Sequence, residues 1–135
     1  MPLGAWYHAT KHALEGWSDC LRFETAQFGI KVIIIEPGVI DTDFGKVLLD
    51  PLLSRSGNGV YSAMARKFAK MTEATYIQPG GTSPVSVIST IISRAIKARR
   101  PKTRYVAGRM AKLMICLRQL LGDRGFDRLF RMMLR

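Results

Sequence analysis

The sequence has few cysteines, few acidic residues and no long apolar run, and each shortage excludes a class of function. Cys20 and Cys116 are the two cysteines among 135 residues, and their separation fits neither a metal nor a redox motif, so we assign them no chemistry. The longest aliphatic run, residues 32–35, is far shorter than the roughly 20 apolar residues that span a bilayer as a helix. Residues 1–5 lack the charged and apolar regions of a signal peptide. With 47% hydrophobic residues, the chain is expected to be a cytoplasmic protein of one small domain without a metal site.

The shortage of acidic residues is confined to the last third of the chain. Residues 1–93 hold eight lysines or arginines and eight acidic residues. Residues 94–135 hold 13 lysines or arginines against Asp123 and Asp127, which accounts for the whole net charge of +11. A segment with such an excess needs an explanation of its own.

Among the residues that are present, one pair could take part in a reaction: Tyr7 and Lys11. Residues 7–28 have helical spacing and Gly29 follows at the expected end, so the two side chains share one face of a helix. A cation beside the tyrosine favours the phenolate, and such a tyrosine can donate a proton near neutral pH. A solvated pair on an ordinary helix is the alternative, because Tyr-x-x-x-Lys is common by chance. We give His8 and His12 no role.

The segment after this helix predicts a strand and a ligand loop. Residues 31–36 form a short β-branched run, which is typical of a central parallel strand. Pro37, Gly38 and Thr42 follow at its carboxyl end, where open α/β sheets bind their ligands. Gly38 permits a close backbone approach and Thr42 offers a hydroxyl group, although a plain turn would have the same sequence.

The middle of the chain predicts three helices and a second strand. Residues 44–82 read as two short apolar helices joined by a polar turn, either a substrate lid or a hairpin that packs on the sheet. Ser83 is expected to cap the next helix, with Pro84 at its first position and an end near residue 98. Residues 104–107 predict a strand that pairs in parallel with the first through a right-handed connection.

The tail, residues 109–135, alternates apolar and basic residues and predicts basic amphipathic helices, broken at Gly122 and Gly125. One alternative is that it docks on an anionic membrane surface, so that the protein is peripheral to the membrane. The other is that it covers its own domain or a partner subunit. We expect no nucleic-acid partner, because the arginines alternate with aliphatic residues and no nucleic-acid motif is present.

Tyr7-x-x-x-Lys11, the β-branched strand and Pro37-Gly38-x-x-x-Thr42 occur in an order that resembles the carboxyl-terminal half of a short-chain dehydrogenase/reductase. The likeness extends over nearly the whole chain. It implies an α/β fold: the carboxyl-terminal part of a Rossmann-like, doubly wound parallel sheet over residues 1–108, with a lid at 44–82 and the tail at 109–135. The apolar insertion and basic tail look most like members that act on steroids or retinoids.

The resemblance also implies a reaction and a set of roles. The reaction is hydride transfer between NADP or NAD and a lipophilic alcohol or ketone. Tyr7 is then the acid and base, and Lys11 supports it and binds the nicotinamide ribose. The backbone of Pro37, Gly38 and Val39 faces the nicotinamide, and Thr42 bonds to its carboxamide or to the phosphates. The helix that carries Tyr7 often forms a homodimer interface in such proteins.

The sequence departs from that family in two ways. Family members are about twice as long, and the glycine-rich phosphate turn and the catalytic serine upstream of the tyrosine are absent here. We therefore expect a fragment that is inactive alone, with Met1 either a true start or an internal methionine of a longer enzyme. The alternative is a non-catalytic interaction protein whose tail docks to an anionic membrane or to a partner chain.

Overall fold

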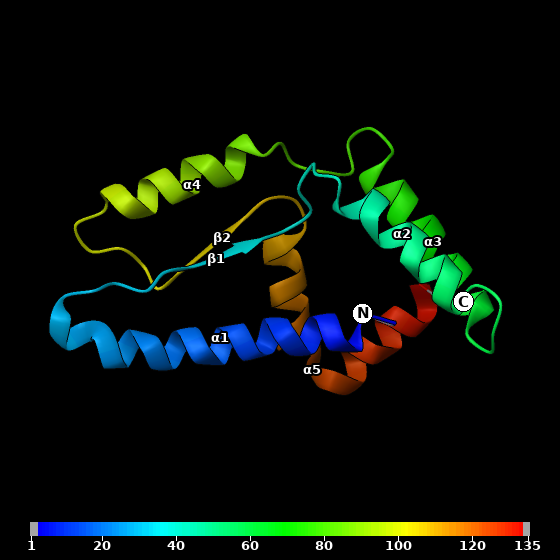
Figure 1. The fold of residues 1–135 in the computed structure, drawn as a ribbon, viewed down its shortest axis with the longest axis horizontal. Helices are drawn as coiled ribbons and strands as arrows, with labels where there is room; N and C mark the ends of the chain where they lie inside the picture. Colours follow the sequence, from blue (N-terminus) through cyan, green and yellow to red (C-terminus); the bar gives the residue numbers. More distant parts are fainter. Residues whose placement is uncertain (1–2, 134–135) are drawn as a thin grey trace.

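The computed structural model describes residues 3–133 and has two strands with helices on either side of them (Figure 1). The elements are α1 (Ala5–Thr25), the 3₁₀ turn η1 (Ala26–Phe28), β1 (Ile34–Pro37), α2 (Phe44–Ser56), α3 (Ser62–Tyr76), α4 (Ser86–Lys97), β2 (Arg104–Ala107) and α5 (Ala111–Met133). In Figure 1, α1 and α4 flank the strands, and α2 and α3 form a hairpin beyond one end of them. The molecule is therefore α/β, with a small sheet and mostly helices, as in part of a Rossmann-like fold.

The two strands pair in parallel, as the sequence predicts, with Ile34 opposite Arg104 and Pro37 opposite Ala107. The first strand is shorter than predicted: it begins at Ile34, not at Lys31, because the first hydrogen bond to the partner runs from the Ile34 N–H to the Thr103 carbonyl, 2.9 Å away. The expected central position is also not found, since within residues 3–133 the sheet has two strands and β1 has one neighbour.

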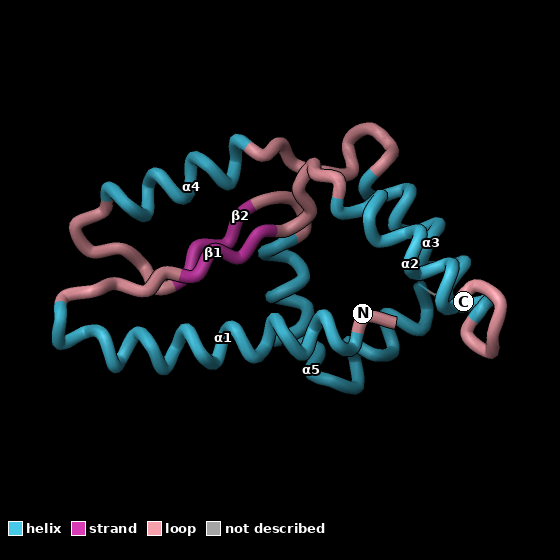
Figure 2. Tube along the Cα trace, in the orientation of Figure 1, coloured by secondary structure: helices cyan, strands magenta, loops and turns pink. Residues whose placement is uncertain are grey.

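The helical predictions up to residue 76 hold with small shifts. The first helix starts at Ala5, two residues earlier than predicted, and ends through η1 before Gly29. The predicted pair of short helices is confirmed as α2 and α3, which Figure 2 shows side by side. A small apolar cluster joins them: Leu49, Leu52, Ala65, Phe68 and Ala69.

The prediction that Ser83 caps a helix is wrong. Helix α4 begins at Ser86, and Ser83 instead forms a parallel bridge with Ile40. The Ser83 N–H donates to the Val39 carbonyl and the Ser83 carbonyl accepts from the Asp41 N–H, each at 2.8 Å. Because both backbone groups of Ser83 are used in this bridge, the chain is extended there and the helix starts only after Pro84.

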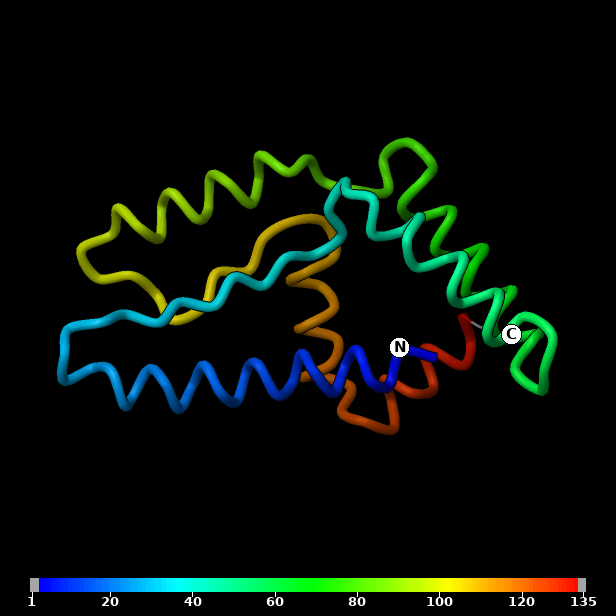
Figure 3. Tube along the Cα trace, in the orientation of Figure 1, coloured from blue at the N-terminus to red at the C-terminus, as the bar shows by residue number. Residues whose placement is uncertain are grey.

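The tail forms two helical segments that meet at a sharp bend and together carry the label α5. Gly122 lies at the bend with φ of 59°, as predicted, but Gly125 lies within helix and does not interrupt it. Beyond the bend the helix turns toward α3 (Figure 3). Leu134 and Arg135, at the end of the predicted tail, lie outside the described residues. Among residues 3–133, no helix is both long and apolar enough to span a membrane.

The chain is unusually open for its mass. Its accessible surface is 10177 Å² for 15.1 kDa. A compact monomer of that mass exposes about 7,100 Å². Large apolar side chains such as Trp6 and Trp17 on α1 are exposed, and no large side chain in the described part of the chain is fully buried. The exposed apolar face of α1 is of the kind that other protein normally covers.

Candidate active site

Helix α1 is held against the sheet by the guanidinium group of Arg104 on β2. This group lies 2.9 Å from carboxylate oxygens of both Glu15 and Asp19 on α1, and 3.4 Å from Glu36 on β1. The hydrogen bond to Arg104, followed by that to Arg22, lowers the pKa of the Asp19 carboxyl. Burial, followed by the charge of Glu15, raises the pKa of Glu36. These ion pairs fix the position of α1 relative to the two strands. They therefore also fix the position of Tyr7, near the start of α1.

The loop after β1 is fixed on both sides by backbone hydrogen bonds. The Gly38 N–H donates to the Ala107 carbonyl at 2.7 Å, and the Val39 N–H donates to the Arg109 carbonyl at 3.0 Å. On the other side lies the bridge to Ser83, whose hydroxyl also accepts from the Arg109 N–H at 2.8 Å. The loop is therefore preorganised, which a ligand site at the carboxyl end of a sheet requires.

Gly38 permits a close approach of the backbone, but the group that approaches it belongs to this chain and is not the expected ligand. A Cβ atom at this position would lie 2.1 Å from the Arg109 carbonyl oxygen and 2.9 Å from the Ala111 Cβ. The space beside Gly38 is thus filled by the turn between β2 and α5, which is part of the same chain. This contact explains the glycine without a ligand, and it ties the loop to the start of α5.

Tyr7 lines a pocket of about 380 Å³, and residues of the loop after β1 line it as well. The pocket is lined by Tyr7, Pro37, Gly38, Ile40, Thr42, Phe44, Tyr76, Val85 and Ile88. Four of the predicted site residues, Tyr7, Pro37, Gly38 and Thr42, thus meet although they come from two separate segments. Lys11 and Val39 are not among the lining residues. The amino group of Lys11 lies 5.4 Å from the centre of the Tyr7 ring, so the predicted sharing of a helix face is confirmed.

Sequence reasoning missed the aromatic side of this pocket. The Phe44 ring lies 5.9 Å from the Tyr7 ring and 5.8 Å from the Tyr76 ring, centre to centre, which is typical of aromatic contact. Burial, together with the proximity of Tyr7, raises the pKa of the Tyr76 hydroxyl. The apolar character of residues 44–82 was the available signal, but it could not show which of their side chains face Tyr7.

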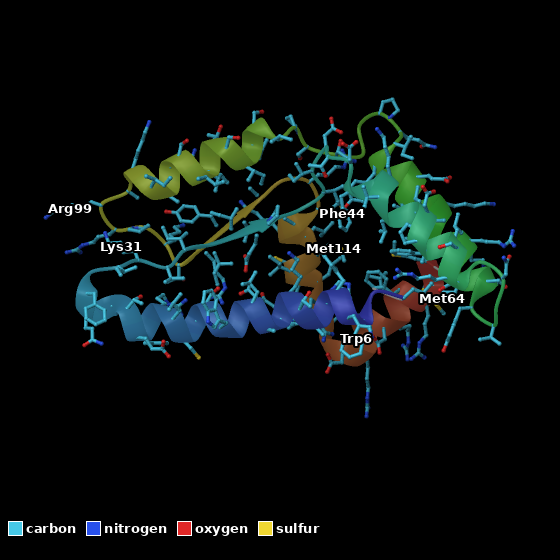
Figure 4. All side chains as sticks on the ribbon, in the orientation of Figure 1. Trp6, Lys31, Phe44, Met64, Arg99 and Met114 are labelled. Carbon is cyan, nitrogen blue, oxygen red and sulfur yellow. The ribbon has the colours of Figure 1, made fainter. Side chains whose placement is uncertain are left out.

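The arrangement can support proton transfer in a mostly apolar site. The Tyr7 side chain is half exposed, lies beside the Lys11 cation and the Phe44 ring, and lines the same pocket as Thr42. Figure 4 shows Phe44 on the hairpin side of the strands, at the start of α2. Such a pocket suits a substrate with an apolar body and one polar group that reaches the tyrosine.

Comparison with known proteins gives matches to one family. The family model described as short chain dehydrogenase matches residues 1–51. A probable short-chain type dehydrogenase/reductase, VdlC of Helicobacter pylori, is 29% identical over 93% of this chain and 45% of its own length. Human retinol dehydrogenase 16 is 34% identical over 82% of this chain and 37% of its own length. An NADPH-dependent 3-dehydrocapnine reductase of Ornithobacterium rhinotracheale is 32% identical over 92% of this chain and 42% of its own length.

The chain therefore spans less than half the length of these three relatives. No solved structure gives a significant match. The family match covers Tyr7, Lys11 and the loop after β1, and the relatives extend it over most of the remaining chain. The family model and these relatives together support assignment of the chain to the short-chain dehydrogenase/reductase family.

Proposed function

We propose that this chain forms the substrate side of the active site of an NAD(P)-dependent oxidoreductase. The observation that supports the proposal best is the pocket that joins Tyr7 of α1 to Pro37, Gly38 and Thr42 of the loop after β1. The two segments are about 30 residues apart, and their meeting at the carboxyl end of parallel strands is what the reaction needs. The substrate is a lipophilic alcohol or ketone, because the rest of the pocket is apolar or aromatic.

In this proposal the Tyr7 hydroxyl is the acid and base. In the direction of reduction it donates its proton to the substrate carbonyl oxygen, and in the direction of oxidation it accepts the proton of the alcohol. Lys11, with its ammonium group 5.4 Å from the ring centre, stabilises negative charge on the tyrosine. Lys11 does not line the pocket itself, and its amino group would bind the ribose hydroxyl groups of a bound cofactor.

The residues present fit the nicotinamide end of a cofactor but not its phosphates. The backbone of Pro37 and Gly38 lines the pocket and, with Val39, would face the nicotinamide ring. The Thr42 hydroxyl oxygen accepts a hydrogen bond from the Phe44 N–H at 3.4 Å, and its proton would be donated to the carboxamide. A bound nicotinamide supplies or accepts the hydride. The sequence has no glycine-rich turn of the kind that cradles a pyrophosphate, so the adenosine end must be held by residues outside this sequence. The choice between NAD and NADP is made by that same part.

Phe44 and Tyr76 recognise the apolar body of the substrate in this scheme. They come from the two ends of the α2–α3 hairpin and contact Tyr7 through Phe44. We infer that the hairpin acts as the lid over the substrate. Human retinol dehydrogenase 16 and mouse retinol dehydrogenase 7, at 34% and 32% identity, support a lipophilic substrate by their names.

Two experiments test the proposal. In the first, NADH and NADPH are titrated into the 135-residue chain in a calorimeter, and we expect no tight binding because the phosphate site is missing. In the second, the amino-terminal part of retinol dehydrogenase 16 is joined to residues 1–135 and the product is assayed with retinol and with retinal. Turnover that depends on Tyr7 supports the proposal. A folded joined protein that binds cofactor but turns over none of a panel of alcohols and ketones contradicts it.

A further inference from the structure

The end of the molecule opposite the pocket carries a concentrated positive charge. The end of α1, residues 29–33, the end of α4 and residues 98–103 meet there, at the amino ends of β1 and β2 (Figure 1). They enclose a hollow of about 370 Å³ that no acidic side chain lines. Its cationic lining residues are Arg22, Lys31, Arg99, Arg100 and Lys102.

The cations are held close together by the fold. The Lys31 amino group donates to the Arg99 carbonyl at 2.7 Å and so joins residues 29–33 to residues 98–103. Figure 4 shows Lys31 and Arg99 at this end, far from Phe44. Arg22 is paired with Asp19 at 2.6 Å, and Glu24 is the other acidic residue of this part of α1. Four exposed cations remain on the two loops: Lys31, Arg99, Arg100 and Lys102.

Large apolar side chains stand exposed among these cations. Phe28 is 72% exposed, Ile30 is 56% exposed and Ile96, at the end of α4, is 76% exposed. Solvation explains a charged surface but not aliphatic and aromatic side chains that protrude from it. Cations beside protruding apolar residues are typical of surfaces that lie in a membrane interface, where head groups meet the charges and acyl chains meet the apolar groups.

We propose that this amino-end surface, comprising Phe28, Ile30, Lys31, Ile96, Arg99, Arg100 and Lys102, docks on an anionic phospholipid bilayer. The cations contact lipid phosphate and carboxylate groups, and Phe28, Ile30 and Ile96 enter the interface. The pocket, at the opposite end of the strands, then faces the aqueous side. This surface is distinct from the tail that the sequence suggests as a membrane contact.

The tail is the other surface of the chain that could meet a bilayer, and part of its apolar surface is already in contact with the chain. In the second half of α5, Phe126 and Phe130 lie 4.8 Å apart and line a groove shared with Ala5 of α1 and Met64 of α3. Arg118 and Arg131 line the same groove, and the Arg118 guanidinium lies 5.3 Å from the centre of the Phe126 ring, so these two rings contact other parts of the chain. Leu120, Met132 and Met133 of the tail are also exposed, as are Arg124, Arg128 and Arg131, so matched variants of the two surfaces decide between them.

The test is flotation of the full chain with vesicles of phosphatidylcholine, alone or mixed with phosphatidylserine. We expect binding only with phosphatidylserine, and weaker binding as salt is added. The variant R99Q/R100Q/K102Q removes three exposed charges and leaves Lys31 in its hydrogen bond. Since each cation near such a surface changes partitioning about fivefold, the variant should bind on the order of a hundredfold more weakly.

The matched control is R124Q/R128Q/R131Q, which removes three charges from the tail and should bind nearly as well as the unchanged chain. The pair F28A/I96A should weaken binding while V47A, an exposed apolar residue of α2, should not. Circular dichroism of each variant checks that the helices are kept. Equal losses in the two arginine variants, a larger loss in the tail variant, binding to neutral vesicles alone, or tighter binding to duplex DNA than to anionic vesicles would each overturn the proposal.

Discussion

The ring of Tyr7 on α1 lies 5.9 Å from the ring of Phe44, the first residue of α2. This contact joins the helix that carries the predicted acid and base to the hairpin predicted as the lid. Since Phe44 also contacts Tyr76, the three rings form one continuous side of the pocket.

Replacing Phe44 with alanine should weaken binding of a lipophilic substrate. The change removes ring contacts worth about 0.5–1.5 kcal/mol each, so KM should rise while kcat changes less. Steady-state assays of the protein joined to an amino-terminal half, with retinal and with a small ketone, check this, and the rise should be larger for retinal. Val47→Ala on the same helix is the control, and an equal effect of both substitutions would argue against a role of Phe44 in the pocket.

Replacing Gly38 with alanine should destabilise the fold, because the added methyl group would meet the Arg109 carbonyl and Ala111. Overpacking of this kind costs about 1–3 kcal/mol. Urea denaturation followed by circular dichroism measures it. Gly16→Ala is the matched control: nothing lies within 4 Å of its Cβ position, and alanine within a helix should add about 0.5–1 kcal/mol of stability. Loss of stability in both variants would contradict the close approach at Gly38.

Acidification should loosen the attachment of α1 to the sheet. Arg104 and Arg22 hold the pKa of Asp19 below its usual value, so Asp19 contributes stability above its unfolded pKa of about 3.9. That contribution is lost as the pH falls through the lower, folded pKa. Urea midpoints measured from pH 6 downward should fall more steeply for the unchanged chain than for Asp19→Asn. Asp50→Asn, an exposed carboxylate on α2, should keep the full pH dependence.

Ionisation of Glu36 should have the opposite effect on stability to ionisation of Asp19. Its pKa is raised by burial and then by Glu15, so its ionisation opposes folding above its unfolded pKa of about 4.3. Glu36→Gln should therefore reduce the stability that is lost as the pH rises from 4 to neutral. The variant also removes the contact with Arg104. An unchanged pH profile in this variant would show that Glu36 is not part of the network.

The sequence predicts the elements that depend on a local residue pattern. It does not predict the features that depend on contacts between distant segments. Helices α1, α2 and α3 follow from apolar spacing, and the Tyr7–Lys11 face follows from helix geometry. Ser83 was misassigned because a serine before proline suits both a helix cap and an extended bridge, and only the loop at Val39 selects the bridge. The start of β1 depends on where its partner begins, because the first hydrogen bond runs from the Ile34 N–H to the Thr103 carbonyl, just before β2. Phe44 and Tyr76 could not be assigned, because their position depends on how the hairpin packs.

The central claim is that Tyr7 exchanges the proton with the substrate. Its most direct test is the Tyr7→Phe variant of the protein joined to an amino-terminal half, with Tyr61→Phe, at an exposed residue just before α3, as the control. Loss of a positioned acid and base should lower kcat by about 10²- to 10⁴-fold while binding of the nicotinamide cofactor is kept. Tyr61→Phe should retain full activity. A Tyr7→Phe variant that binds cofactor and turns over substrate at the rate of the unchanged protein would contradict the assignment.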